Sequence, residues 1–351
     1  MNNYAQVPRT AAGTFIAVRK LALCLFALVL ATAVFAGSQF SSIVVFGDSL
    51  CDTGRLFRLT HGGFPPRVAY FEGRQTNGPV WVEYLAARMG LEHHLKNYAV
   101  VGAMTGPGAG YLYTGNVWSD TYPGAVLEGT SVKGQLAQYL ASTGGKVDPE
   151  ALYIVEGGAN DLINPLTQLL LNPPASQAEF AQDVQTIATP VVVNIATVAG
   201  TLKALGAQHI AIVNVPDFGK APRIVHYGPQ ASAVVSYLVD SVNEAVGGQL
   251  DLLDAAGGNK FVRIDAYSFI DGVVESPAHF WFANVTDQFM TLDRATLTVT
   301  YASPHRCDSW KWFFWDELHP STRGHEFFAE FALATLHAAD PSPHSLHGAC
   351  R

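Results

Sequence analysis

Short apolar runs separated by longer helix-like stretches are the feature that most restricts the fold of this 351-residue chain. Four runs have the length and composition of buried strands, and they cover residues 43–46, 152–155, 210–215 and 261–264. Three longer apolar stretches have the length of helices, and they cover residues 183–205, 231–253 and 324–337. Pro190 is expected to kink the first of these helices. Strands that alternate with helices predict an α/β domain with a largely parallel sheet.

The chain is expected to form one large domain. Of its residues 49% are hydrophobic and 14% are charged, which suits a substantial core and not a disordered or coiled-coil protein. No internal repeat or charged linker divides residues 40–340. Two Gly- and Pro-rich segments, 102–129 and 266–308, are interpreted as long loops that carry binding surface.

The N-terminus has the pattern of a secretory signal peptide. Arg19 and Lys20 precede an uncharged apolar run over residues 21–35, and small residues follow it. We expect cleavage after Ala36, or as a second choice after Ala33, which leaves residues 37–351 as a single secreted domain. The alternative is an N-terminal membrane anchor, but 15 residues fall short of the roughly 20 that span a bilayer. No other stretch is interpreted as a membrane span.

The charge distribution argues against a nucleic-acid partner. The formal net charge is −8, and the part after residue 36 carries 18 basic against 29 acidic residues, a net charge of −11. Phosphate neutralisation needs a cluster of Lys and Arg, and the sequence has none. The acidic body also makes an anionic membrane surface a poor partner.

The cysteines and histidines do not suggest a metal or another cofactor. Cys24 leaves with the signal peptide, and of the remaining Cys51, Cys307 and Cys350 the last two are a plausible disulfide pair. His93 and His94 are adjacent and lack neighbouring carboxylates, so surface histidines are the preferred interpretation. Asn284 begins the one N-x-S/T sequon.

Polar residues of the types used in acyl transfer follow two of the predicted strands. Ser49 comes directly after the first strand in GDSL (47–50), where open α/β sheets place their sites. Asn160 follows the second strand in GGAND (157–161), and its amide is a candidate oxyanion donor. Taken singly, each of these is more simply a turn or capping residue.

A serine nucleophile also needs a base, and a histidine near the C-terminus, with an aspartate beside it, is the candidate. In WDELHP (315–320) Asp316 precedes His319 by three residues, so that one loop can fix the geometry of the pair. Gly102, in NYAVVGA (97–103), lets a backbone N–H approach a ligand closely. Nucleophile, donors, base and orienting carboxylate together predict a serine acyl-transfer site.

With these four blocks in this order, the chain resembles the GDSL lipase/esterase family, also called SGNH hydrolases. The blocks are GDSLCDTG, NYAVVGA, GGAND and WDELHP, and the segment 71–85 is also similar to the family. The resemblance implies a flavodoxin-like three-layer α/β/α sandwich. The nucleophile elbow Gly-x-Ser-x-Gly of the α/β-hydrolases is absent around Ser49.

The resemblance also implies a role for each site residue. Ser49 is the expected nucleophile, His319 its base and Asp316 the partner of His319. The backbone N–H groups of Ser49 and Gly102 and the side chain of Asn160 form the expected oxyanion hole. Many relatives have two glycines in the second block, and Val101 stands at the first of these positions, which leaves open which N–H faces the site.

The sequence favours a secreted hydrolase of small-molecule or lipid esters without a cofactor. An acyltransferase that uses the same triad is the alternative, and a non-catalytic binding protein is a more distant one. Aromatic residues near the site either line an acyl pocket or sugar platform or pack in the core; they are Tyr111, Tyr113, Trp118, Tyr122, Phe280, Trp281, Phe282, Trp310, Trp312, Phe313, Phe314 and Trp315.

Overall fold

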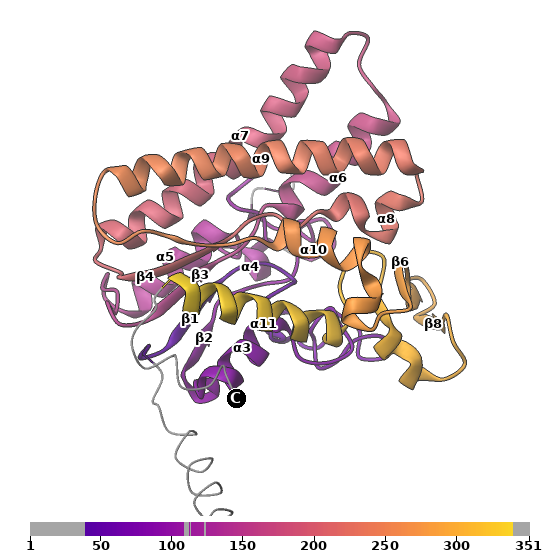
Figure 1. The fold of residues 1–351 in the computed structure, drawn as a ribbon, viewed down its shortest axis with the longest axis horizontal. Helices are drawn as coiled ribbons and strands as arrows, with labels where there is room; N and C mark the ends of the chain where they lie inside the picture. The colour runs from indigo at the N-terminus through magenta and orange to yellow at the C-terminus, as the bar shows by residue number, and fades with distance from the viewer. Residues whose placement is uncertain (1–38, 109–111, 113, 123, 340–351) are drawn as a thin grey trace, which may run out of the picture. The chain divides into compact units, whose positions relative to one another are not determined.

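A computed structural model describes residues 39–339, except 109–111, 113 and 123 (Figure 1). Several of the predictions lie outside these residues. They concern the signal peptide with its cleavage sites after Ala33 and Ala36, and the residues Cys24, Cys350, Tyr111 and Tyr113.

A five-stranded parallel sheet forms the centre of the described domain. Its strands are β1 (Ile43–Phe46), β2 (Leu95–Asn97), β3 (Leu152–Val155), β4 (His209–Val213) and β5 (Val262–Ile264). They lie in the order β2-β1-β3-β4-β5, and every neighbouring pair is parallel. This is the flavodoxin-like order, in which ligands bind at the carboxyl ends of the strands where the order reverses, between β1 and β3.

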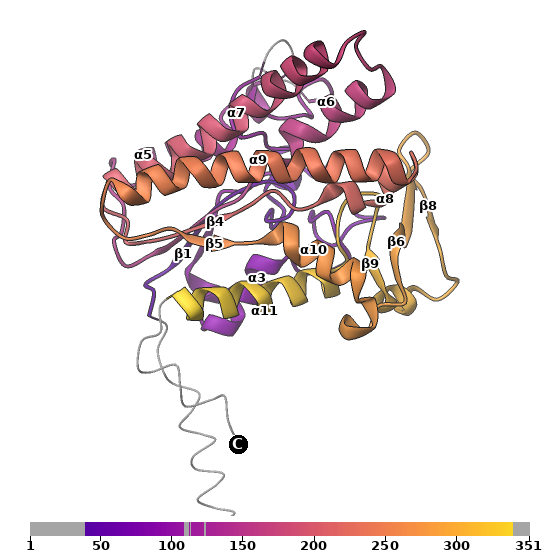
Figure 2. The same cartoon turned by 45° about the horizontal axis from the view of Figure 1, so that its top comes forward.

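Helices cover both faces of this sheet (Figures 1 and 2). On one face Ile43 and Val45 of β1 pack in a cluster with residues of α3 (Trp81–Met89) and α11 (Thr322–Ala339). Val44 and Phe46 point to the opposite face, since side chains alternate along a strand, and join a larger cluster. That second cluster includes residues of α5 (Val132–Ser142), α7 (Gln177–Ala204) and α9 (Pro229–Ala255). The predicted α/β/α sandwich is therefore confirmed.

The remaining helices are shorter or lie at the carboxyl ends of the strands. They are α2 (Arg55–Leu59), α4 (Gly124–Leu127), α6 (Ala159–Leu171), α8 (Pro222–Val225) and α10 (Ala266–Glu275), with 3-10 turns η1 (Glu92–His94), η3 (Phe218–Lys220), η4 (Pro277–Phe280) and η5 (Arg306–Lys311).

The apolar runs predicted the main elements to within a few residues. Two strands match at both ends, and the predicted 210–215 and 261–264 correspond to β4 and β5. The predicted helices correspond to α7, α9 and α11, although α7 begins six residues earlier than expected, at Gln177. Pro190 lies inside α7, which continues on both sides of it.

The interpretation of 266–308 as a long loop was wrong. The segment forms α10, η4 and the strands β6 (Asn284–Gln288), β7 (Met290–Asp293) and β8 (Thr298–Tyr301), and β6 pairs with β9 (Trp312–Phe314). In α10 the apolar residues Phe269, Ile270 and Val273 recur at helical spacing and are buried. In the β7–β8 ribbon only alternate residues face the core, so the segment looks polar although it is paired.

Among the described residues, α7 is long and apolar enough to cross a membrane by length and composition. Of the apolar stretch that meets this criterion 28% is buried, and the buried residues of α7 include Val191, Ile195 and Val198. The absence of a membrane span after signal removal stays a prediction.

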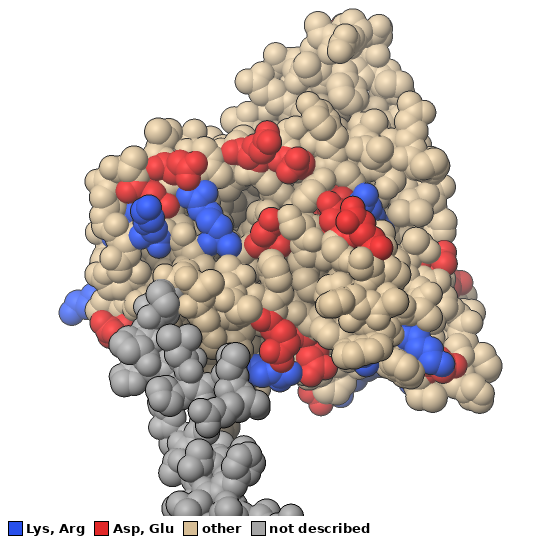
Figure 3. Space-filling view, viewed as in Figure 1, with Lys and Arg blue, Asp and Glu red and all other residues tan. Residues whose placement is uncertain are grey.

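The structure describes several other residues that the sequence singles out. His93 and His94 are exposed, and the described residues hold no cluster of His, Cys, Asp and Glu that could bind a metal ion. Cys51 is buried and Cys307 is exposed, and each is a free thiol among these residues. On the part of the face that Figure 3 shows, basic side chains lie singly among acidic ones and form no continuous basic patch.

Candidate active site

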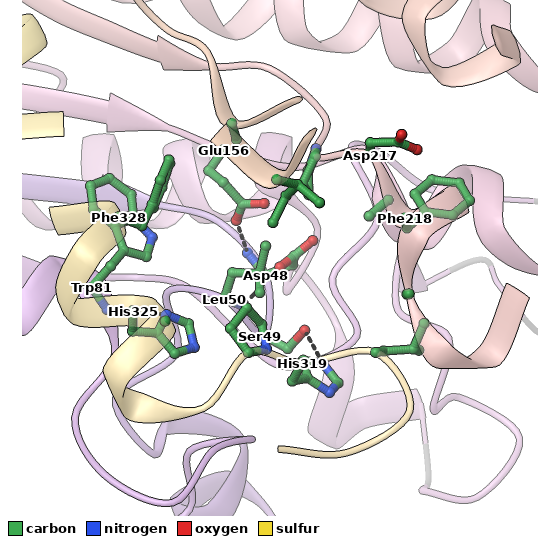
Figure 4. Close-up of a pocket in the computed structure, with 18 of the residues that line it drawn as sticks. Asp48, Ser49, Leu50, Trp81, Glu156, Asp217, Phe218, His319, His325 and Phe328 are labelled. Atoms are coloured by element: carbon green, nitrogen blue, oxygen red, sulfur yellow. Dashed lines mark hydrogen bonds between the residues drawn. The ribbon is translucent and has the colours of Figure 1, made fainter. Parts of the chain in front are cut away.

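The loop after β1 carries Ser49 and is held by two buried side chains from other elements. Gln135 of α5 accepts the Gly47 N–H at 2.8 Å and donates to the Gly47 carbonyl at 2.8 Å. Glu156, which directly follows β3, accepts the Asp48 N–H at 3.0 Å (Figure 4). Because the backbone on both sides of the Gly47–Asp48 peptide is fixed, the position of Ser49 is fixed with it.

A second loop, between β9 and α11, carries both Asp316 and His319. The Trp315 N–H donates to the His319 carbonyl at 2.8 Å and closes this loop. The Trp315 ring is buried, and its Nε1–H donates to the Ala69 carbonyl at 3.0 Å. The loop therefore presents both side chains from one short, anchored segment, as the spacing of the two residues predicts.

The two loops bring Ser49, His319 and Asp316 into one hydrogen-bonded row. His319 Nε2 lies 2.9 Å from Ser49 Oγ (Figure 4), and His319 Nδ1 lies 2.8 Å from Asp316 Oδ1 and 2.9 Å from Oδ2. Asp316 Oδ1 also accepts the N–H groups of Leu318 and His319, at 2.9 and 2.7 Å. The Tyr70 hydroxyl donates to Asp316 Oδ2 at 2.8 Å. A carboxylate held in this way keeps the imidazole in the tautomer whose Nε2 faces the serine.

The electrostatics of this row favour an imidazolium paired with a carboxylate. Burial by itself lowers the pKa of His319, but the charge and hydrogen bond of Asp316, with a smaller effect of Asp48, leave it above its ordinary 6.5. Burial raises the pKa of Asp316, but His319 and the backbone N–H groups outweigh that and lower it. The arrangement therefore suits a histidine that gains a positive charge, as a base does when it accepts a proton.

Two backbone N–H groups beside Ser49 Oγ are free to bind an oxyanion. The Val101 N–H donates to Asp52 Oδ2 at 2.8 Å and is not available. The N–H groups of Ser49 and Gly102 have no acceptor among the described residues. Gly102 has φ of +78°, which favours glycine, and borders the same groove as Ser49. The geometry therefore favours the Gly102 N–H over that of Val101.

Asn160 lies beside Ser49 at the start of α6, but its amide is hydrogen-bonded within the protein. Its Nδ2 donates to the Ala103 carbonyl at 3.0 Å and to Asp48 Oδ2 at 3.2 Å. The bond to Asp48 is the longer of the two, and an oxyanion bound beside Ser49 would compete with Asp48 for the hydrogen that makes it.

Ser49 and His319 stand where a narrow apolar pocket meets a wider polar groove. The apolar pocket reaches under the carboxyl ends of the strands; it is lined among others by Leu50, Phe269, Ile270, Phe314 and Phe328. The polar groove opens on the other side; it is lined among others by Tyr70, Asn164, Arg223, Arg294 and Glu317. One side of the serine therefore suits an acyl chain and the other a polar alcohol.

The aromatic residues singled out in the sequence divide between core and site. Phe313, Phe314 and Trp315 are buried, and of these Phe314 also borders the apolar pocket. Trp118 borders the polar groove. Trp281 and Trp310 remain exposed.

Sequence reasoning missed Tyr70, Gln135 and Glu156 as parts of the site. Glu156 directly precedes the GGAND block, and Tyr70 directly precedes the segment 71–85, so both stand next to recognised motifs. A polar residue within a predicted buried region is a usable signal, because such a group needs a partner. Gln135 lies in a helix with no motif of its own.

Comparisons with known proteins agree with this geometry. The sequence model of the family "GDSL-like Lipase/Acylhydrolase" matches residues 43–332. The chain is similar to a thermolabile hemolysin of Vibrio parahaemolyticus, with 27% identity over 84% of the chain and 63% of the hemolysin. It is similar to a phosphatidylcholine-sterol acyltransferase of Aeromonas hydrophila, with 29% identity over 58% of the chain and 54% of that protein.

A third relative matches over more of its own length. A GDSL esterase/lipase of Arabidopsis thaliana is 26% identical over 84% of the chain and 88% of the plant protein. The chain spans less than two thirds of the length of the two bacterial relatives. The family match spans the sheet, both site loops and most of α11, and the chain belongs to the GDSL-like lipase/acylhydrolase family.

Proposed function

We propose that the protein hydrolyses carboxylic esters through an acyl-enzyme on Ser49. The observation that carries this proposal is the row of hydrogen bonds from Ser49 Oγ to His319 Nε2, at 2.9 Å, and from His319 Nδ1 to Asp316. A serine hydroxyl is a weak nucleophile until a base removes its proton, and His319 Nε2 is hydrogen-bonded to the Ser49 hydroxyl.

In the first step His319 takes the Ser49 proton while Oγ attacks the ester carbonyl carbon. The oxyanion of the tetrahedral intermediate is bound by the N–H groups of Ser49 and Gly102 and by the Asn160 amide, which turns from Asp48 to the substrate. His319 then gives its proton to the oxygen of the leaving alcohol. In the second step His319 activates a water molecule, which releases the acid and restores Ser49.

The two compartments beside Ser49 support an ester of an aliphatic acid with a polar alcohol. Phe269, Ile270 and Phe328 line the apolar pocket, and an acyl chain bound there contacts apolar side chains instead of water. Arg223 and Arg294 stand among the hydrogen-bonding groups of the polar groove. The narrowness of the apolar pocket favours short or medium acyl chains over long ones.

Acyl transfer to an alcohol is the second candidate. The polar groove is wide enough for a second hydroxyl compound, and one relative is named as an acyltransferase. The same acyl-enzyme serves both reactions, and they differ in whether water or an added alcohol receives the acyl group. Secretion completes the proposal, since residues 1–36 have the pattern of a signal peptide.

One experiment tests these points together. The protein is collected from the culture medium of a secreting host, its N-terminus is sequenced, and it is assayed with p-nitrophenyl acetate, butyrate and palmitate. We expect a first residue of Gly37, faster turnover of the two shorter esters, and loss of nearly all activity in Ser49→Ala. Glycerol added during turnover distinguishes transfer, which yields glyceryl ester, from hydrolysis. A Ser49→Ala protein with wild-type turnover rejects the mechanism.

A further inference from the structure

Two buried carboxyl groups, those of Asp48 and Glu156, lie next to the loop that carries Ser49 and take no part in the proton transfers described above. Asp48 and Glu156 are each about 1% exposed. Glu156 accepts the Asp48 N–H at 3.0 Å (Figure 4), and its carboxyl group lies within hydrogen-bonding reach of the Asp48 carboxyl group. Gly47 makes room for them, because a Cβ at that position would lie 2.8 Å from Glu156 Oε2.

Two carboxyl groups that share a hydrogen bond need a proton between them. If both were ionised, two negative charges would face each other without solvent, which is strongly unfavourable. Burial raises the pKa of both groups, and for Glu156 the Asp48 charge raises it further, well above its ordinary value. For Asp48 the Leu50 N–H and the nearby His319 partly offset burial. The proton therefore resides on Glu156 and the charge on Asp48.

The charged member of this pair contacts the catalytic groups. Asp48 Oδ1 accepts the Leu50 N–H at 3.0 Å, and Oδ2 accepts the Asn160 amide at 3.2 Å. These bonds span the two sides of Ser49. The orientation of Asp48 therefore decides where the Asn160 amide and the backbone around Ser49 point.

We propose that Glu156 is a positioning residue: it keeps one proton between its carboxyl group and that of Asp48, so that the pair carries a single charge and holds Asn160 and the Ser49 backbone at the oxyanion site. This role rests on the proposed ester hydrolysis. As the oxyanion forms, the Asn160 hydrogen leaves Asp48, and the Glu156 proton remains to stabilise the carboxylate that loses it.

Other titratable groups face the pair and set its surroundings. His319, in the loop between β9 and α11, acts electrostatically on Asp48, and Cys51, in the loop after β1, contacts Glu156. Asp161 of α6 is near enough to Asp48 for the two charges to interact. His325 of α11 and Asp217 after β4 border the same apolar pocket. His325 is neutral, with a pKa lowered by burial to about 3, so it adds no charge near neutral pH.

The test compares Glu156→Gln, Glu156→Ala and the exposed control Glu150→Gln by infrared difference spectroscopy and by kinetics from pH 5 to 10. An amide in Glu156→Gln replaces the protonated acid and can still accept the Asp48 N–H and donate to the Asp48 carboxylate. We expect the wild-type minus Glu156→Gln spectrum at neutral pH to contain the carbonyl band of a protonated carboxylic acid. The Glu150→Gln difference spectrum should lack that band.

For activity we expect kcat of Glu156→Gln to stay within about threefold of wild type. We expect kcat of Glu156→Ala to fall at least about tenfold with KM unchanged, because the oxyanion donors lose their orientation. If loss of the shared proton lowers the kcat of wild type at alkaline pH, the pH profile of Glu156→Gln should show no such decrease in kcat.

Three results overturn the proposal: no protonated-acid band assigned to Glu156, wild-type kcat in a folded Glu156→Ala, or equal losses of kcat in the Gln and Ala variants. If Glu156→Ala does not fold, the spectrum and pH profile of Glu156→Gln decide alone. Retained activity in Ser49→Ala would reject the proposed function, and the infrared band would still test the shared proton.

Discussion

At the scale of single residues, burial lowers the pKa of His319, the proposed base, and the carboxylate of Asp316 more than offsets that effect. It receives four hydrogen bonds, from Tyr70, Leu318 and both the backbone and the ring of His319. Because an anion held in this way raises the pKa of the imidazole, the base is protonated at a higher pH than an isolated histidine.

The pH dependence of activity follows from this. In the proposed mechanism His319 acts as a base only when neutral, so we expect kcat/KM to rise with pH through an apparent pKa above 6.5. Asp316→Asn removes the charge that raises that pKa. We expect its acid limb at lower pH than in wild type, and a loss of kcat of the order of 10⁴-fold. Profiles of kcat/KM against pH measure both effects, with the exposed Asp240→Asn as control. An unmoved acid limb in Asp316→Asn contradicts this account.

Contacts between distant residues explain why parts of the site were not predicted. Ser49, Asp316, His319 and Asn160 stand in local motifs, and the structure brings them together. Tyr70 reaches Asp316 across 246 positions in sequence, and no local pattern encodes such a contact. For Gly102 the sequence left two N–H groups possible, and only the hydrogen bond between Val101 and Asp52 distinguishes them.

At the scale of elements, the loop around Gly102 connects the end of β2 to the nucleophile. Asn97 donates to the Cys51 carbonyl at 2.7 Å, and Asp52 accepts the Val101 N–H. Each loop thus fixes the backbone of the other, so the N–H groups of Ser49 and Gly102, the proposed oxyanion donors, form one rigid unit.

We expect Gly102→Ala to disturb this unit. A Cβ there would lie 2.5 Å from Trp118 Cδ1 and 2.8 Å from Asn116 Oδ1, in a backbone with φ of +78°. The loop must shift, so kcat should fall roughly 10- to 100-fold and the melting temperature should drop. Gly144→Ala is a matched control, since Gly144 has φ of +64° and nothing within 4 Å of such a Cβ. Its melting temperature alone should fall, by the equivalent of about 1–2 kcal/mol. Equal kinetic effects in both variants would exclude the loop argument.

The strands that were predicted well are buried on both faces, and the helices that were predicted well have long apolar stretches. β1 and β3 are continuous apolar runs because both faces of the parallel sheet are covered, and α9 and α11 have long apolar patterns. β2 has only three residues, Leu-Lys-Asn, at the edge of the sheet, and carries no recognisable pattern. The ribbon β7–β8 is half exposed and was taken for loop for the same reason.

At the scale of the whole molecule, one buried acid should make stability depend on pH. Asp161 accepts the Thr105 N–H and hydroxyl at 2.9 and 2.8 Å, and burial outweighs these bonds and raises its pKa from 3.8 to about 7. Between these values the native state binds a proton that the unfolded chain has lost. Its contribution to stability is full below pH 4, falls as pH rises to about 7, and is constant above that.

Asp161→Asn removes this titration. We expect its free energy of unfolding to change less between pH 4 and 7 than that of wild type, by at most about 4 kcal/mol at 1.36 kcal/mol per pKa unit. Urea unfolding at pH 4, 5.5 and 7 measures the difference, and Asp183→Asn, at an exposed position of α7, is the control. Parallel pH dependences in Asp161→Asn and wild type would show that the native carboxyl titrates normally.

The distance in sequence between Ser49 and His319, 270 positions, has a consequence for biosynthesis. A ribosome delivers Ser49, the proposed nucleophile, early, and His319, its proposed base, only near the end, directly before α11. Incomplete chains that end before His319 therefore contain Ser49 without the base that activates it. Hydrolytic capacity arises in one step with completion of the fold, so the proposed activity is absent from every earlier stage of the protein's production.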